Sequence, residues 1–273
     1  MLEALGGLLI GGCLGLLGSG GSILTVPLLV YLLGHEPKVA IAESLAIVGG
    51  IALIGAIGPM MRRRVDWPSV IFFGVPALAG TIGGVWVSQF MSGAWQLAIF
   101  AAVMLFAAGL MFRGREATVG EDRPPRTSRD MVLAVIEGIG VGILTGIVGV
   151  GGGFLIVPAL VLLGRLSMPV AVGTSLVIIA IKSLVGFLKN WDQLAGSEFE
   201  VSWPTILLFI AFGGVGSLLG MGLGRRLPQE RLRQVFAVFL VLTGIAILVL
   251  TGPKMIEGTT PTPADGPGST LVD

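Results

Sequence analysis

Two glycine clusters are the places where this sequence can expose backbone groups inside an apolar environment. Gly18–Ser22 reads Gly-Ser-Gly-Gly-Ser and Gly149–Gly153 reads Gly-Val-Gly-Gly-Gly, and each lies within a long apolar segment. Each glycine inside a helix costs roughly 1 kcal/mol relative to alanine, so a cluster breaks the helix. A helix that restarts near Ser22 or Gly153 presents N–H groups and the positive end of its dipole, which favour an anion. The alternative interpretation is that the glycines only allow close helix packing.

Polar side chains near the second cluster favour the same chemistry. Lys182 stands well inside an apolar segment, where an ammonium group needs a cavity or a partner. Ser175 lies seven residues earlier on the same helical face, and Thr174 adjoins it. Alternatively, Lys182 snorkels to the surface or neutralises a carboxylate. We predict an anion site whose members are Gly20, Gly21, Ser22, Ser44, Gly151, Gly152, Gly153, Thr174, Ser175 and Lys182.

A carboxylate beside this set suggests proton coupling. Glu43 adjoins Ser44, and a carboxylate near a transport path can take up a proton and couple its movement to that of the substrate. Because Glu43 stands only a few residues into its apolar segment, a solvated helix end is the competing interpretation. Glu137 is a weaker candidate for the same reason. His35 lies in a short polar loop and is expected to be solvated.

Other site chemistries find no support in the sequence. The chain has one histidine and one cysteine, Cys13, which allows neither an intrachain disulfide nor a cysteine-based metal site. Neither glycine cluster is followed by the Lys-Ser/Thr of a nucleotide-binding loop. The net charge of +1 gives no reason to expect nucleic acid. We therefore expect a protein that is not an enzyme and has no metal, cofactor or nucleic-acid partner.

The composition identifies the environment of the chain as lipid. Hydrophobic residues make up 54% of the sequence and charged residues only 12%, about half the share in soluble domains. Most apolar segments reach the roughly 17–25 residues that a membrane-spanning helix needs, and they lack the alternation of a membrane barrel. We predict an all-α polytopic membrane protein. The segments lie at about 4–33, 39–61, 69–90, 94–112, 131–164, 169–189, 203–224 and 232–251.

The two halves of the chain repeat each other. Gly18–Pro27 aligns with Gly149–Pro158, and at the same offset Ser44-Leu45 matches Ser175-Leu176. After a short insertion, four further matches follow in order: Trp67-Pro68 with Trp203-Pro204, Phe73 with Phe209, Gly80 with Gly216, and Gly84 with Gly220. Ordered matches of this kind indicate a duplicated fold. We expect a first transmembrane repeat at 1–112, a cytoplasmic linker at 113–130, a second repeat at 131–252 and a disordered tail at 253–273.

Two topologies fit the long broken segments 4–33 and 131–164. If each crosses the membrane once, there are eight spans and the repeats run parallel. If each is a re-entrant hairpin, each half has three further spans, the repeats are inverted, and every arginine shares one side, with Lys38, Lys189 and Lys254 on the other. The positive-inside rule then makes the arginine-rich side cytoplasmic and places both termini outside. We favour the hairpin topology because it separates the charges more cleanly.

The glycine motifs resemble those of a known family. Gly149–Pro158, followed by Ala171-Val-Gly-Thr-Ser-Leu176, is similar to the signature of the TauE/SafE sulfite exporter family, also called the 4-toluene sulfonate uptake permease family. The first copy, Gly18–Ser22 with Ala42-Glu-Ser-Leu45, fits the duplicated architecture of that family, and the resemblance covers roughly residues 4–251. Glu43 and Ser22 depart from the usual pattern, in which Thr or another small residue and Gly, respectively, are common.

The resemblance implies secondary transport of small sulfur-containing anions, such as sulfite, sulfonates or sulfoacetate, driven by protons across a prokaryotic cytoplasmic membrane. Together with the residues, it predicts a secondary active transporter of the cell (inner) membrane with a midplane site between two helix breaks. The expected partners are a small anionic substrate, protons and the lipid bilayer. The alternatives are an anion channel of the same fold and a membrane scaffold that transports nothing.

Overall fold

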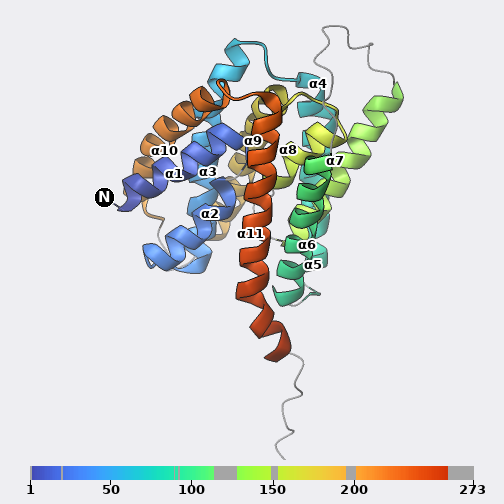
Figure 1. Ribbon diagram of the computed structural model, residues 1–273. Helices are drawn as coiled ribbons and strands as arrows, with labels where there is room; N and C mark the ends of the chain where they lie inside the picture. The colour runs from blue at the N-terminus through green and yellow to red at the C-terminus, as the bar shows by residue number, and fades with distance from the viewer. Residues whose placement is uncertain are drawn as a thin grey trace, which may run out of the picture.

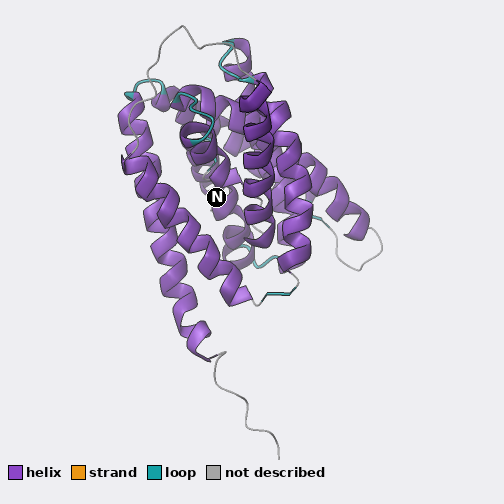
Figure 2. Ribbon diagram, turned by 90° about the vertical axis from the view of Figure 1, so that its right-hand side faces the viewer, coloured by secondary structure: helices purple, strands orange, loops and turns teal. Residues whose placement is uncertain are grey.

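The computed structural model describes residues 2–19, 21–88, 90–91, 93–113, 128–148, 153–194 and 201–257. Every regular element in these ranges is helical (Figure 2). The linker residues 114–127 and the tail residues 258–273 lie outside the described part. The tail was predicted to begin at 253, but the last helix continues through Glu257. Because the regular elements of the described ranges are helical, the predicted all-α fold is confirmed. The boundary between the last helix and the tail lies after Glu257 and not at 253.

Eleven α-helices and two π-helical stretches make up the described chain (Figure 1). The π-helical stretches continue or join α-helices, so several elements form one longer helix. In chain order the elements are α1 (Leu2–Leu17), α2 (Gly21–Pro27), η1 (Leu28–Leu32), α3 (Pro37–Met61), α4 (Trp67–Ser69), η2 (Val70–Gly74), α5 (Val75–Ser88), α6 (Gly93–Arg113), α7 (Ser128–Val148), α8 (Gly153–Leu162), α9 (Met168–Leu194), α10 (Trp203–Gly224) and α11 (Gln229–Glu257).

Six stretches of the described chain are long and apolar enough to cross a bilayer. They are Val39–Met61, Trp67–Ser88, Arg129–Ile147, Met168–Leu188, Trp203–Gly224 and Glu230–Val249. Large apolar side chains also cover their outer surfaces; Phe106 and Leu219, for example, are 68% and 65% exposed. Such extensive apolar exposure is stable only against lipid. The chain is a multi-pass membrane protein.

Both long apolar segments break at their glycine clusters. α1 ends at Leu17 and α2 begins at Gly21, while α7 ends at Val148 and α8 begins at Gly153. Gly18 has a φ of +75°, in the left-handed region that glycine occupies without a steric penalty. The second arms, α2 with η1 and α8, are too short to cross a bilayer alone.

Glycine-lined seams join each half of the chain to the other. α1 packs along α10, and α5 packs along α7. In the second pair, Gly138 of α7 lies against the backbone of Phe73 in η2, which leads into α5. Further along, Gly142 lies against Ala77 and Gly146 against Thr81, both in α5. The order is the same on both helices, so the pair is parallel, and the glycines allow the backbones to touch. The first pair is built in the same way, with Gly11 of α1 against Gly213 and Gly15 against Ser217.

The central pair, α3 and α9, runs in opposite directions. Leu45 of α3 lies against Gly186 of α9, Gly49 lies against Ser183, and further along Gly55 lies against Leu176. α3 and α9 are equivalent helices of the two repeats, so equivalent elements point opposite ways across the molecule.

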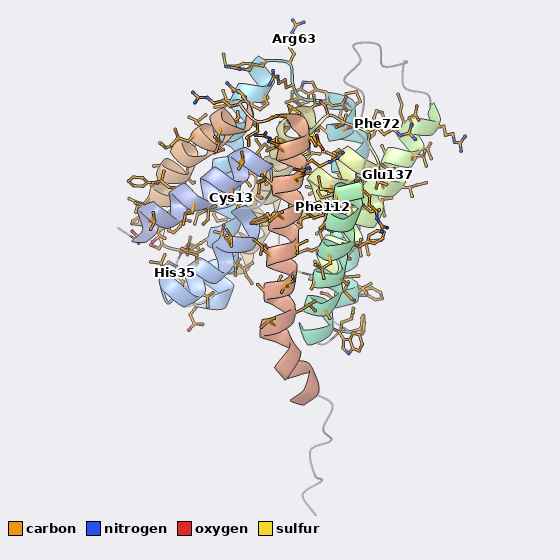
Figure 3. The ribbon with its side chains drawn as sticks, in the orientation of Figure 1. Cys13, His35, Arg63, Phe72, Phe112 and Glu137 are labelled. Atoms are coloured by element: carbon orange, nitrogen blue, oxygen red, sulfur yellow. The ribbon has the colours of Figure 1, made fainter. Side chains whose placement is uncertain are left out.

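The two ends of the molecule differ in charge. Figure 3 shows Arg63 at one end and His35 toward the other. Arg62 and Arg64, which follow α3, lie close to Arg225, which follows α10. The C-terminal ends of α3 and α10 therefore lie near each other. Arg62, Arg64 and Arg225 lie near one another close to Arg63, so the end that carries Arg63 is rich in arginine.

The α5–α7 seam gives a direct test of this packing. We expect Gly142→Ala to lower the thermal unfolding midpoint in detergent, because its new Cβ overlaps the carbonyl oxygen of Ala77. Overpacking of this kind costs about 1–3 kcal/mol. Gly140→Ala, on the same helix, is the matched control, because nothing lies within 4 Å of the Cβ it adds. Equal midpoints for the two variants would show that the seam does not depend on glycine.

Candidate functional site

Ser175 of α9 ties this helix to the first break. Its one O–H is shared between the carbonyl oxygens of Gly18, at 2.9 Å, and of Val172, at 2.8 Å, and its side chain is fully buried. A helix that ends leaves its last carbonyl groups without helical partners, and in an apolar interior these groups need other donors. Ser175 supplies such a donor. Gly18 also packs against Val172 and Val157, so the break is enclosed by α8 and α9.

Lys182, on the same helix, reaches the segment before the second break. Its Nζ donates to the Oγ1 of Thr145 at 3.1 Å, and Thr145 in turn donates to the carbonyl oxygen of Gly142 at 2.9 Å. The hydroxyl of Thr81 on α5 lies 3.5 Å from that of Thr145. Among the residues that the structure describes, no carboxylate pairs with Lys182. Its described partner is a hydroxyl group rather than an opposite charge.

Lys182 lies deep within the membrane-spanning part of α9. Its neighbour Ser183 faces Gly49 near the middle of both α3 and α9, where these helices cross. The span Met168–Leu188 extends well beyond Lys182 toward the arginine-rich end and, less far, toward the other end. The ammonium group bonds Thr145 instead of extending along the helix toward water, so the snorkelling alternative does not describe this conformation. About 10 Å of helix separates Lys182 from Ser175.

The remaining predicted site residues are partly described. Gly21 and Gly153 begin α2 and α8, which touch each other, so arms from the two halves meet. The hydroxyl of Ser44 donates to the carbonyl oxygen of Ile41 in its own helix, at 2.7 Å. Thr174 is fully buried beside Ser175. Gly20, Gly151, Gly152 and the side chain of Ser22 lie outside the described part. The role of this whole set in binding an anion stays a prediction.

Glu43 is buried and bonded. Its side chain has no solvent exposure, its Oε1 accepts from the backbone N–H of Ser202 at 2.7 Å, and its Oε2 lies 2.5 Å from Nδ1 of His35. The interpretation of Glu43 as a solvated helix end is therefore wrong. The expectation for His35 is also wrong, because its side chain is only 21% exposed and pairs with a carboxylate. The contact with Ser202 has no signal in the sequence, because Ser202 lies in the other half of the chain, whereas His35 is only eight residues from Glu43.

Glu43 and Thr174 occupy equivalent repeat positions and make equivalent contacts. The Oγ1 of Thr174 accepts from the backbone N–H of Asp66 at 2.9 Å, as Glu43 accepts from that of Ser202. Asp66 and Ser202 each precede a Trp-Pro pair that begins a helix, α4 or α10. Each half therefore uses this position of its central helix to hold the start of a helix in the other half.

No group of three or more His, Cys, Asp or Glu side chains within the described ranges is placed to hold a metal ion. The polar side chains described above are instead hydroxyls, one ammonium and one carboxylate–imidazole pair. Hydroxyl and ammonium groups donate hydrogen bonds, which suits an oxyanion.

The Thr174 contact can be tested by removing its hydroxyl group. We expect Thr174→Val to lower the thermal unfolding midpoint, because it removes the hydrogen bond between Thr174 and the N–H of Asp66, worth about 0.5–1.5 kcal/mol. Thr174→Ser keeps an oxygen at the same place and should retain most of the stability. A valine variant as stable as the serine variant would show that this contact does not hold α4 in place.

Comparison with known proteins places most of the chain among membrane transporters. The family model described as sulfite exporter TauE/SafE matches residues 3–247. A "Probable membrane transporter protein" of Xylella fastidiosa (strain 9a5c) is 33% identical over 246 residues, which cover 88% of this chain and 91% of that protein. "Probable membrane transporter protein YunE" of Bacillus subtilis (strain 168) is 26% identical over 262 residues, covering 88% and 94%. No solved structure matches.

Proposed function

Because this chain belongs to the TauE/SafE sulfite exporter family, we propose that it is a secondary active transporter of small sulfur-containing anions of the sulfite, sulfonate or sulfoacetate class. The membership rests on a family match over nearly the whole chain, and the related proteins are named as probable membrane transporters. The multi-pass helical fold agrees with that class. The substrate class and the coupling to protons are what this family membership implies, and the site residues support an anion as substrate.

The observation that carries the proposal is the environment of Lys182. A charged side chain deep in a membrane protein is costly unless it serves a partner or a pathway. An ammonium group has three donors, and one of them reaches Thr145. The other two have no partner among the described residues and can bind the oxygens of an anion. Sulfite and sulfonate groups carry several such oxygens on one sulfur atom, so a compact point charge with neighbouring hydroxyls suits them.

The arrangement of the helices supports alternating access as the mechanism. We propose that the two halves form an inverted repeat with the substrate between the breaks, near Ser175 and Lys182. In support, equivalent helices α3 and α9 are antiparallel, and α2 and α8 meet across the halves. Transporters of this architecture expose a central site to either side by rocking one unit against the other. With the arginine-rich end assigned to the cytoplasm, the end with His35 faces outward.

Counterflow in proteoliposomes separates this proposal from its rivals. We expect purified protein to accumulate external radiolabelled sulfite, transiently and above equilibrium, when unlabelled sulfite is loaded inside. A carrier shows such counterflow because one site alternates between sides, whereas a channel only lets the label equilibrate. Sulfoacetate, tested in parallel, covers the larger end of the substrate class. Absence of flux for both anions would contradict the proposed substrate class.

Substitutions on α9 test the site directly. We expect Lys182→Ala to reduce counterflow at least about tenfold, which corresponds to about 1.4 kcal/mol of lost anion stabilisation. The variant should stay folded, because removing a charge from the membrane interior relieves a cost. Ser175→Ala should reduce transport less, since it removes an uncharged hydroxyl whose bonding to Gly18 supports the first break and is worth about 1 kcal/mol.

Glu137→Gln is the matched control, because it removes a partly buried charge from α7 without touching the contact between Lys182 and Thr145. We expect this variant to transport like the wild type. Thermal unfolding in detergent, with and without sulfite, checks that each variant is folded. Wild-type flux in the folded Lys182→Ala protein would remove this residue from the site.

A further inference from the structure

We propose that His35 and Glu43 together form the proton-binding site that couples transport to the proton gradient, and that the same pair latches the start of α10. The proposal deepens the proposed transport function and rests on it. It assigns the proton to a pair of residues, places the pair at the end of the molecule opposite Arg63 (Figure 3), and gives the bound proton a mechanical role.

The pair connects three separate parts of the chain. His35 lies in the turn that follows the arm formed by α2 and η1, Glu43 lies in α3, and Ser202 immediately precedes α10. Both oxygens of Glu43 are used, one by the ring of His35 and the other by the backbone N–H of Ser202. A change in the charge of the pair therefore acts at once on the first hairpin and on a helix of the second half.

The molecule contains its own neutral counterpart of this site. The repeat position of Glu43 is Thr174, and that of His35 is Leu166, which is fully buried. Thr174 holds the backbone N–H of Asp66 at 2.9 Å without any charge. The fold therefore needs only an acceptor at this position. The charge of Glu43 and the imidazole of His35 are additions in one half, and a buried carboxylate without a structural need for its charge points to proton chemistry.

The exposure of the two side chains gives the proton a route. The ring of His35 is 21% exposed and can exchange protons with water, whereas Glu43 is fully buried behind it. When the pair carries a proton on the ring, imidazolium and carboxylate form a charge-assisted hydrogen bond. When that proton returns to water, a buried carboxylate remains with only neutral donors, which is costly. Proton uptake therefore favours the latched state, and proton loss favours release of the start of α10.

Few other described ionisable groups lie on the elements around the pair. Glu36 is on the same turn and exposed, and Glu3 is in the first turn of α1. Lys182 of α9 bonds Thr145 on α7. The first turn of α10 contributes the hydroxyl of Thr205, which bonds that of Ser202. Among the side chains described at this end, Glu43 is a buried carboxylate and His35 is its ionisable partner.

A transplant of the neutral counterpart tests the proposal. The double variant His35→Leu/Glu43→Thr copies the pair found in the other half and keeps an acceptor for Ser202. In proteoliposomes with the membrane potential clamped, a pH gradient of about one unit can drive about tenfold accumulation of labelled sulfoacetate at one proton per anion. We expect wild type to approach this value and the double variant to reach only equilibrium, while counterflow without a gradient persists.

Glu36→Gln, which removes a charge from the same turn and leaves the pair intact, should accumulate anion like wild type. Gradient-driven accumulation by the double variant equal to wild type would overturn the inference and leave the transport function standing. Absence of counterflow in wild type would instead contradict the transport function itself. If the double variant does not fold, Glu43→Gln, which keeps the size and an acceptor oxygen, replaces it with the same expectations.

The single histidine of the chain allows a measurement on the wild-type protein alone. Protein carrying isotope-labelled histidine and a purification tag without histidine gives one imidazole signal in nuclear magnetic resonance spectra. Because coupling is reciprocal, saturating sulfoacetate should change the protonation of this ring at fixed pH. If the protein performs counterflow but the protonation of the His35 ring is the same with and without sulfoacetate, the proposal is overturned.

Discussion

Hydrocarbon offers no hydrogen-bond partner to a broken helix, and the other features of this structure follow from that constraint. The glycine clusters interrupt two apolar helices inside the molecule, so the groups that they release must be satisfied by protein. Ser175 provides a donor to Gly18, and α8 and α9 enclose the break. A break that is covered in this way also provides N–H groups at membrane depth, which is the property that an anion site needs.

Close packing between the halves supports these breaks. Carbonyl oxygens of α5 lie where side chains of α7 would be, and the same relation holds between α10 and α1. Such seams need glycine because lipid does not push helices together as water does, and close backbone approach supplies the van der Waals contact instead. The helix before each break is thus fixed to the opposite half of the molecule. Any movement of one half relative to the other would change the packing at these seams and at the crossing of α3 with α9.

Polar side chains depart from the repeat in a consistent way. Lys182 corresponds to Ile51 and Thr145 to Leu14, and both of these apolar counterparts are fully buried. Glu43 and His35 correspond to Thr174 and Leu166. In each case one half uses a neutral group for packing or for a single hydrogen bond, and the other half adds charge. Charge in the membrane interior is costly, so these one-sided additions are not needed for packing alone.

The sequence by itself determined the membrane environment, the helical class, the positions of the breaks, the duplication and the family. Each of these depends on local composition or on a repeated pattern, such as the apolar runs around Gly18 and Gly149. Individual contacts were beyond it. Tertiary structure decided which residues pair. Lys182 bonds Thr145, and Ser175 bonds Gly18. Glu43 bonds His35 and Ser202. Most of these contacts join residues far apart in the chain, and only the packing of helices sets which faces meet. No spacing along the sequence carries that information.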